Sequence, residues 1–99
     1  MNVRFLKACL TEIEDALTWY GTQSPELPER VLKEIADAVE KLGPFPEAFH
    51  LAIPPYRRIL LSKFPYSLFF RVESGEIILV AFFHQQSDPQ KWRSLLKNR

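Results

Sequence analysis

The segment IILVAFFH, residues 77–84, constrains the fold more than any other part of this sequence. Its apolar side chains follow one another without alternation, which is typical of a strand covered on both faces. Ser74-Gly75 precedes it between two glutamates and indicates a two-residue hairpin turn. The segments YRRILLSK (56–63) and YSLFFRV (66–72) also have the composition of strands. We therefore predict a three-stranded antiparallel meander whose last strand lies in the centre of the sheet.

Two amphipathic helices precede the meander. From Cys9 onward, apolar residues recur at three- and four-residue steps with acidic residues on the opposite side, and Gly21 is the predicted end. In the second helix, Ser24 is the predicted N-cap, Pro25 the first residue and Gly43-Pro44 the end. The stripes predicted to be buried are Leu10, Ile13, Leu17 and Tyr20 in the first helix and Leu27, Val31, Ile35, Ala38 and Leu42 in the second. Because the connection is short, the helices should form an antiparallel hairpin.

The remaining segments complete the prediction of an α+β fold. Val3 to Leu6 has the composition of a short N-terminal strand, and DPQKWRSLLKNR (88–99) begins with an aspartate cap and a proline, which predicts a short C-terminal helix. GPFPEAFHLAIPPY (43–56) carries four prolines and is predicted to be an irregular loop. Both long helices should cover one face of the sheet. Only the terminal helix and this loop are left for the other face, so we expect an open apolar surface there that binds a partner.

Composition narrows the classes of function. Thirteen basic and twelve acidic residues give a formal net charge of +1, so any contact with nucleic acid has to come from a local patch. The single cysteine, Cys9, excludes an internal disulfide, and no cysteine and histidine cluster has the spacing of a metal site. Charges interrupt residues 1–20 before they could act as a signal peptide or a membrane span. We predict one cytoplasmic domain over residues 1–99 with no metal, cofactor or membrane partner.

Three segments together resemble the RelE/ParE superfamily of bacterial type II toxin-antitoxin toxins, which includes the plasmid stabilisation proteins. They are WYGTQSPELPERVLKEIADAVEKL (19–42), YRRILLSKFPYSLFFRVE (56–73) and GEIILVAFFHQQSDPQKWR (75–93), and their order and spacing carry the resemblance. The resemblance implies a fold of strand, helical hairpin, three-stranded meander and short terminal helix. It also implies a growth-inhibiting toxin that is neutralised when a cognate antitoxin wraps over it.

The superfamily divides in mechanism. RelE-like members cleave messenger RNA on the ribosome with basic side chains and, in some members, a histidine, whereas ParE-like members inhibit DNA gyrase. By the resemblance, two cleavage-associated arginines are replaced by Ser67 and Ser87, and Arg58 is the basic position that still matches. Such a loss removes charge stabilisation on the order of 10²–10³ in rate per donor, which favours the ParE-like mechanism. A ribosome-dependent mRNA endonuclease and a decayed toxin that only binds its antitoxin stay open as alternatives.

The candidate catalytic and contact residues are basic. Arg58 and His84 are the candidate catalytic residues, and Arg57, Lys63 and Arg71 are the candidates for phosphate or target contact. Arg57 and Arg58 are consecutive on a strand, so only one of them can face a ligand. Structural roles stay open as well: a solvated charge for the lysine, an ion pair with a neighbouring glutamate for Arg71, and packing for His84.

The candidate antitoxin-binding residues are mostly aromatic. They are Tyr66, Phe83, Trp92 and Leu95, which we expect on the open face of the sheet and on the terminal helix. Large aromatic side chains are common anchors in protein interfaces. The alternative role for these side chains is packing in the core.

Overall fold

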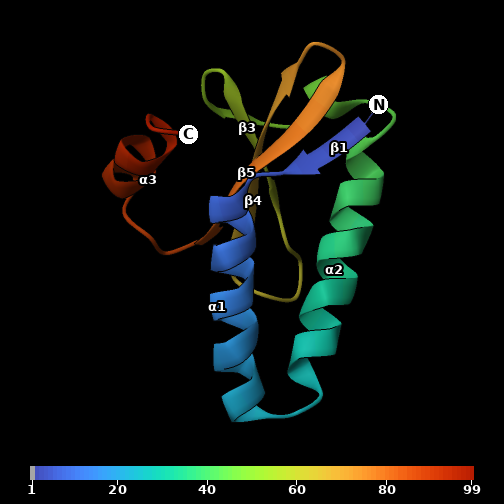
Figure 1. The fold of residues 1–99 in the computed structure, drawn as a ribbon, viewed down its shortest axis with the longest axis vertical. Helices are drawn as coiled ribbons and strands as arrows, with labels where there is room; N and C mark the ends of the chain where they lie inside the picture. Colours follow the sequence, from blue (N-terminus) through green and yellow to red (C-terminus); the bar gives the residue numbers. More distant parts are fainter. Residues whose placement is uncertain (1) are drawn as a thin grey trace.

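The computed structural model describes residues 2–99 (Figure 1). Its helices are α1 (Lys7–Gln23), α2 (Leu27–Leu42) and α3 (Pro89–Leu96); its strands are β1 (Asn2–Phe5), β2 (Leu51–Ile53), β3 (Tyr56–Leu60), β4 (Tyr66–Glu73) and β5 (Glu76–His84); and a 3₁₀ turn covers Pro46–Ala48. The strands form one mixed sheet in the order β1-β5-β4-β3-β2, with β1 parallel to β5 and the other pairs antiparallel. The predicted α+β fold of strand, helical hairpin, meander and terminal helix is confirmed.

β5 is a central strand, as its unbroken apolar run predicts. It lies between β1 and β4, and every residue from Ile77 to Phe83 is buried. Ser74 and Gly75 have positive φ angles of 51° and 74°, which is the conformation that joins two twisted strands by a two-residue loop. The predicted hairpin of β4 and β5 is therefore present.

A β-bulge interrupts the alternation of side chains between the two faces along β5. Two consecutive residues of β4 pair with Ala81 and Leu79, so Val80 is an extra residue in the ladder. Val80 and Ala81 consequently face the same side of the sheet. Leu79 and Phe82 face α1 and α2, whereas Val80, Ala81 and Phe83 face α3.

Helices α1 and α2 cover one face of the sheet and form its larger core (Figure 1). The side chains that they bury are Cys9, Ile13, Ala16 and Tyr20 from α1 and Val31, Ile35, Ala38 and Leu42 from α2. Leu17 and Leu27 are partly buried at the margin of this core. The prediction is wrong for Leu10, which is exposed, because α1 turns Cys9 and Ala16 toward the sheet.

The connection between the two helices differs from the prediction at both ends. α1 continues past Gly21 to Gln23, and the Ser24 amide donates a hydrogen bond to the Tyr20 carbonyl, so Ser24 ends α1 and does not cap α2. α2 begins at Leu27 without a side-chain cap, and its early proline occupies a position where no amide donor is needed. The antiparallel arrangement itself is as predicted (Figure 1).

The proline-rich segment contains a short strand, contrary to the prediction of an irregular loop. β2 pairs with β3 at the edge of the sheet. It lies between the two pairs of prolines, and an edge strand needs hydrogen bonds on one side only. Ala52 and Ile53 pack on the α3 side, so this segment also covers part of the sheet.

Helix α3 covers the second face, which corrects the expectation of an open apolar surface. The Asp88 carboxylate caps this helix as predicted and accepts a hydrogen bond from the Gln90 amide. Trp92 and Leu96 are buried in a cluster with residues of β4 and β5, and Phe83 is only 7% exposed. The apolar surface of β5 is therefore internal and is not left open for a partner.

Candidate functional site

The four residues predicted to bind an antitoxin line one groove. Tyr66, Phe83, Trp92 and Leu95 surround a space of about 270 Å³ between α1 and α3, over the end of β5. We call this space the α1–α3 groove. Trp19 contributes to it from α1 and is 56% exposed. Exposed aromatic surface bordered by polar residues is typical of a protein-binding site.

Packed aromatic rings support the groove from the sheet. Tyr66 stacks on Phe82 with ring centroids 4.6 Å apart and an interplanar angle of 8°, and it makes edge contacts with Tyr20 and His84. Burial raises the pKa of Tyr66, and burial together with the neighbouring Tyr66 raises the pKa of Tyr20. Both phenols therefore keep their protons at neutral pH and remain hydrogen-bond donors.

An ion pair lies at the edge of this groove. The Arg99 guanidinium donates to both carboxylate oxygens of Glu12, at 2.9 Å each, and to the Val80 carbonyl at 3.1 Å. Glu12 also accepts a hydrogen bond from the Phe82 amide at 3.0 Å. The side chains of Glu12 and Arg99 are 21% and 15% exposed, so solvent screens their attraction only in part. We call this pair the Glu12–Arg99 clamp.

The candidate basic residues lie on different parts of the sheet. The Arg58 guanidinium lies over the Trp92 ring on the α3 side, 5.2 Å from the ring centroid. Arg57 points to the α1–α2 side and donates to the Phe49 carbonyl at 2.9 Å. The two arginines thus face opposite sides, as consecutive strand residues should. Lys63 lies in the turn between β3 and β4, where its amide donates to a carboxylate of α2 at 2.8 Å.

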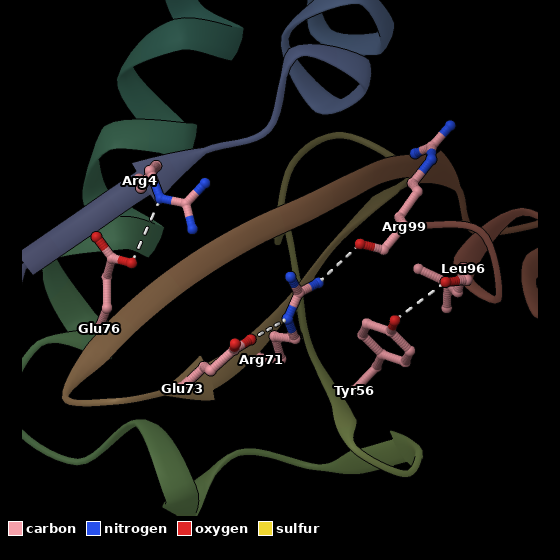
Figure 2. A network of polar contacts seen from close by, with 7 residues as sticks. All are labelled: Arg4, Tyr56, Arg71, Glu73, Glu76, Leu96 and Arg99. Atoms are coloured by element: carbon pink, nitrogen blue, oxygen red, sulfur yellow. Dashed lines mark hydrogen bonds and ion pairs between the residues drawn. The ribbon is translucent and has the colours of Figure 1, made fainter.

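Arg71 belongs to a polar network that ties the C-terminal residues to the sheet (Figure 2). Its guanidinium donates to Glu73 at 2.9 Å and to the Arg99 main-chain oxygen at 3.2 Å. In the same view, the Tyr56 hydroxyl donates to the Leu96 carbonyl at 3.0 Å. The ion pair of Arg71 with Glu73 is therefore present, and this arginine has a structural role in holding α3.

Arg58 and His84, the candidate catalytic pair, are not brought together. The His84 ring lies against Tyr66 on the α1–α2 side of the sheet, with ring centroids 5.2 Å apart, and its Nδ1 accepts a hydrogen bond from the Gln86 amide at 3.1 Å. Arg58 lies on the opposite side. A proton acceptor and a stabilising cation have to reach the same phosphate, and the sheet separates these two side chains.

Ser67 and Ser87 are placed differently from one another. Ser67 is fully buried between β3 and β5, and its hydroxyl has no hydrogen-bond partner within residues 2–99. Ser87 follows β5 and lines the α1–α3 groove. Neither position carries a cation that could contact a phosphate.

Other reactive groups are scarce in the part of the chain that the structure describes. No group of three or more histidine, cysteine, aspartate or glutamate side chains there is placed to hold a metal ion. None of the helices in residues 2–99 is long and apolar enough to cross a membrane. Burial, with a smaller contribution from Glu12, raises the pKa of the Cys9 thiol to about 12, so this thiol is unreactive at neutral pH.

Comparison with known proteins adds to this geometry. Residues 3–89 match the family model described as "ParE toxin of type II toxin-antitoxin system, parDE". The chain belongs to this family. It is also similar to a solved structure titled "Chromosomal ParDE TA system from P. aeruginosa", with a TM-score of 0.75 and 19% identity over 85% of this chain and 95% of that chain, which supports the fold. A search of curated proteins found no match.

Membership of the ParE family supports a toxin role and a cognate antitoxin as partner. The resemblance inferred from the three sequence segments is therefore confirmed. The matched residues end at Pro89, so most of α3 lies beyond them. Trp92 and Leu95 are in that part, which means that one wall of the groove is built from residues outside the family match.

Sequence reasoning missed three residues of this ParE-family site. Trp19 lies one position away from the buried Tyr20 on α1, and its exposure could have been found by plotting the helix faces. Glu12 and Arg99 are separated by 87 positions, and neither has a local pattern that predicts their contact. Their pairing follows only from the packed fold.

Proposed function

We propose that this ParE-family chain arrests growth by binding DNA gyrase and that it has no RNA-cleaving activity of its own. The strongest support is the separation of Arg58 from His84 by the sheet. Cleavage of RNA needs a proton acceptor and cationic groups around one phosphate. The Arg58 guanidinium packs against the Trp92 ring, and Arg71 is hydrogen-bonded within the protein. Both of these cations are therefore engaged in contacts within the protein.

We further propose that the antitoxin binds in the α1–α3 groove and that this takes place in the cytoplasm. Tyr66, Phe83, Trp92 and Leu95 provide its apolar surface, and the exposed ring of Trp19 is available as an anchor. Apolar anchors in a bordered groove supply most of the binding energy in many protein complexes. If the same groove contacts the target, an antitoxin that fills it would neutralise the toxin directly.

Induced expression in a bacterial culture tests the toxin role. The chain is expressed alone and together with the product of the adjacent small reading frame. We expect growth arrest that the neighbouring product relieves. Unimpaired growth, with soluble protein confirmed, would contradict the proposal and favour a decayed toxin that only binds its antitoxin.

Two assays with purified protein separate the mechanisms. We expect excess toxin to stop supercoiling by gyrase and to leave messenger RNA intact on ribosomes with a codon in the decoding site. A double variant, Arg58→Ala with His84→Ala, should inhibit gyrase if it retains the fold, because neither residue is assigned a chemical step. Cleaved message that this double variant fails to produce would instead support the RelE-like endonuclease.

A further inference from the structure

A second groove lies between α2 and the turn that joins β3 to β4. Its space of about 300 Å³ shares no lining residue with the α1–α3 groove. We call it the α2–β3 groove. In Figure 1, α2 and α3 lie on opposite sides of α1. A ligand bound in the α2–β3 groove would therefore leave the α1–α3 groove free for another partner.

Positive charge remains without a counter-ion in the α2–β3 groove. Two carboxylates line it, and both are engaged: Glu34 accepts hydrogen bonds from the Lys63 amide at 2.8 Å and the Ser62 hydroxyl at 3.2 Å. The second carboxylate, Asp37, pairs with Lys33 at 3.5 Å. Three further cations line the groove, and their side chains form no ion pair within residues 2–99: Arg30, Lys41 and Lys63. The groove is therefore suited to an anionic ligand.

The cations of α2 form a row that is long enough for several phosphates. Arg30 and Lys41 are eleven positions apart, which is close to three full helical turns and about 16.5 Å along the helix axis. One strand of duplex DNA carries a phosphate about every 3.4 Å along the duplex axis, so about five phosphates fit along this row. A nucleic-acid backbone laid along α2 would thus present a phosphate to each cation without needing an exact register.

The residue types of the groove favour a nucleic-acid duplex over a protein partner. Three of the four cations that residues 2–99 place there are lysines, and lysine is depleted in protein–protein interfaces. Its compact charge on a flexible stem suits phosphate contacts that are independent of base sequence. Single strands are bound by stacking their bases on aromatic rings. Within the described residues, the one aromatic ring that lines the groove is Phe64, which is only 8% exposed.

We propose that the α2–β3 groove binds the phosphate backbone of the duplex DNA on which gyrase acts, through Arg30, Lys41 and Lys63. This inference rests on the proposed function, because gyrase brings the DNA to the toxin. The net charge of +1 gives the whole chain little attraction for free DNA. Once the toxin is bound to gyrase, its contact with the DNA takes place within one complex and is strengthened by the high effective concentration.

Binding of the full chain to purified gyrase, with and without linear duplex DNA, tests the proposal. We expect the duplex to strengthen binding at least about tenfold, because it adds a second attachment to a complex that already forms. This gain should weaken with salt. The slope of log affinity against log salt concentration should become more negative by about 2–3 with the duplex, since each of the three phosphate contacts contributes about 0.9.

Two matched triple variants test whether the gain comes from the groove. The groove variant carries Arg30→Gln, Lys41→Gln and Lys63→Gln. The control variant replaces one arginine and two lysines that are exposed and line neither groove, with Lys7→Gln, Arg93→Gln and Lys97→Gln. Both variants lose three positive charges, so their long-range attraction to DNA weakens equally. We expect the groove variant to lose the gain from the duplex and the control variant to keep it within about twofold.

The outcomes separate this inference from the proposed function. Equal affinity with and without the duplex, or a gain that both triple variants keep, overturns the DNA contact and leaves gyrase binding intact. Weaker binding of the groove variant to DNA-free gyrase would place these cations against the enzyme and would also overturn the DNA contact. A gain that single-stranded DNA of the same length reproduces overturns the assignment to a duplex. Absence of binding to gyrase in every condition contradicts the proposed function, and the inference is overturned with it.

Discussion

The two faces of the sheet are covered by different kinds of contact. On the α1–α2 face, two long helices bury continuous apolar stripes against β3, β4 and β5. On the α3 face, one short helix covers a smaller cluster around Trp92, and polar contacts of Tyr56, Arg71 and Arg99 hold the C-terminal residues in position. Apolar burial has little directional preference, whereas hydrogen bonds require defined positions. The α1–α2 face, which has the larger apolar core, therefore supplies most of the stability. The hydrogen bonds of the α3 face fix the position of α3, which forms one wall of the groove.

The two walls of the α1–α3 groove differ in how firmly they are packed. Binding sites are commonly built from the parts of a protein that open most easily, because a ligand can then adjust them. α3 buries only two side chains, Trp92 and Leu96, and it forms one wall of the α1–α3 groove. The more extensively packed α1 forms the other wall. We therefore expect the α3 wall of the groove to open more easily than the α1 wall.

The largest expected effect comes from placing a charge on each face in turn. Phe82→Asp should destabilise the fold by more than about 4 kcal/mol, because the new carboxylate is buried under the helices and lies near Glu12. Phe83→Asp should cost at least about 1 kcal/mol less than Phe82→Asp, because the Arg99 guanidinium, 5.5 Å from the Phe83 ring centroid, offsets part of the burial of the new carboxylate. Urea denaturation of the two variants measures the difference. Equal losses would mean that the two faces contribute equally.

Alkaline pH should act mainly through the α1–α2 face. Burial raises the pKa of Cys9 from 9.0 to about 12, so above pH 9 the unfolded thiol ionises while the folded thiol keeps its proton. The protonated folded thiol therefore adds to the free energy of unfolding in full below pH 9, and this addition is lost as the pH rises from 9 to 12. The total loss is about 4 kcal/mol, at about 1.4 kcal/mol for each pH unit. The raised pKa values of Tyr20 and Tyr66 act in the same direction.

The control for this pH dependence is Cys9→Ala. Its urea midpoint should fall less steeply between pH 9 and pH 11 than that of the wild type, because only the tyrosines then contribute. Parallel curves for the two proteins would show that the thiol is not responsible.

Local patterns predicted the α1–α2 face and failed at contacts that depend on the packed fold. The stripe of α2 and the central position of β5 can be read from consecutive residues, since burial determines both. The bulge at Val80 has no such signal, because register depends on the partner strand. β2 was missed because an edge strand of three residues between prolines leaves almost no pattern. Ser24 has the right residue type for a cap, but the preceding helix uses its backbone.

Among the candidate site residues, the structure brings the apolar ones together and separates the basic ones. The large apolar residues predicted to bind an antitoxin come from three elements, β4, β5 and α3, and they do gather in one groove: Tyr66, Phe83, Trp92 and Leu95. The basic residues were chosen by resemblance, and the alternation of β3 sends Arg57 and Arg58 to opposite faces. Whether any of these side chains contacts a partner stays a prediction.

Removing an arginine should show how much the polar contacts of the α3 face contribute. Arg99→Ala should cost about 2–3 kcal/mol, because it leaves the partly buried Glu12 without its cation and the Val80 carbonyl without a donor. Arg4→Ala is the matched control, since the pair of Arg4 with Glu76 is longer, at 3.3 Å, and more exposed (Figure 2). It should cost less than about 0.5 kcal/mol. Similar losses in urea denaturation would mean that the clamp contributes no more than a surface pair.

The smallest effect is expected at Ser67, where the α3 face buries a hydroxyl without a partner. Ser67→Ala removes a polar group that lost its hydration on folding and gained no hydrogen bond, so stability should stay equal or rise by up to about 1 kcal/mol. Ser62→Ala is the control, because the Ser62 hydroxyl donates to Glu34 at 3.2 Å and its loss should lower stability by about 0.5–1 kcal/mol. Urea midpoints compare the two. A clear loss in Ser67→Ala would show that the hydroxyl is hydrogen-bonded through a buried water, and the α3 face would then be held by one more polar contact.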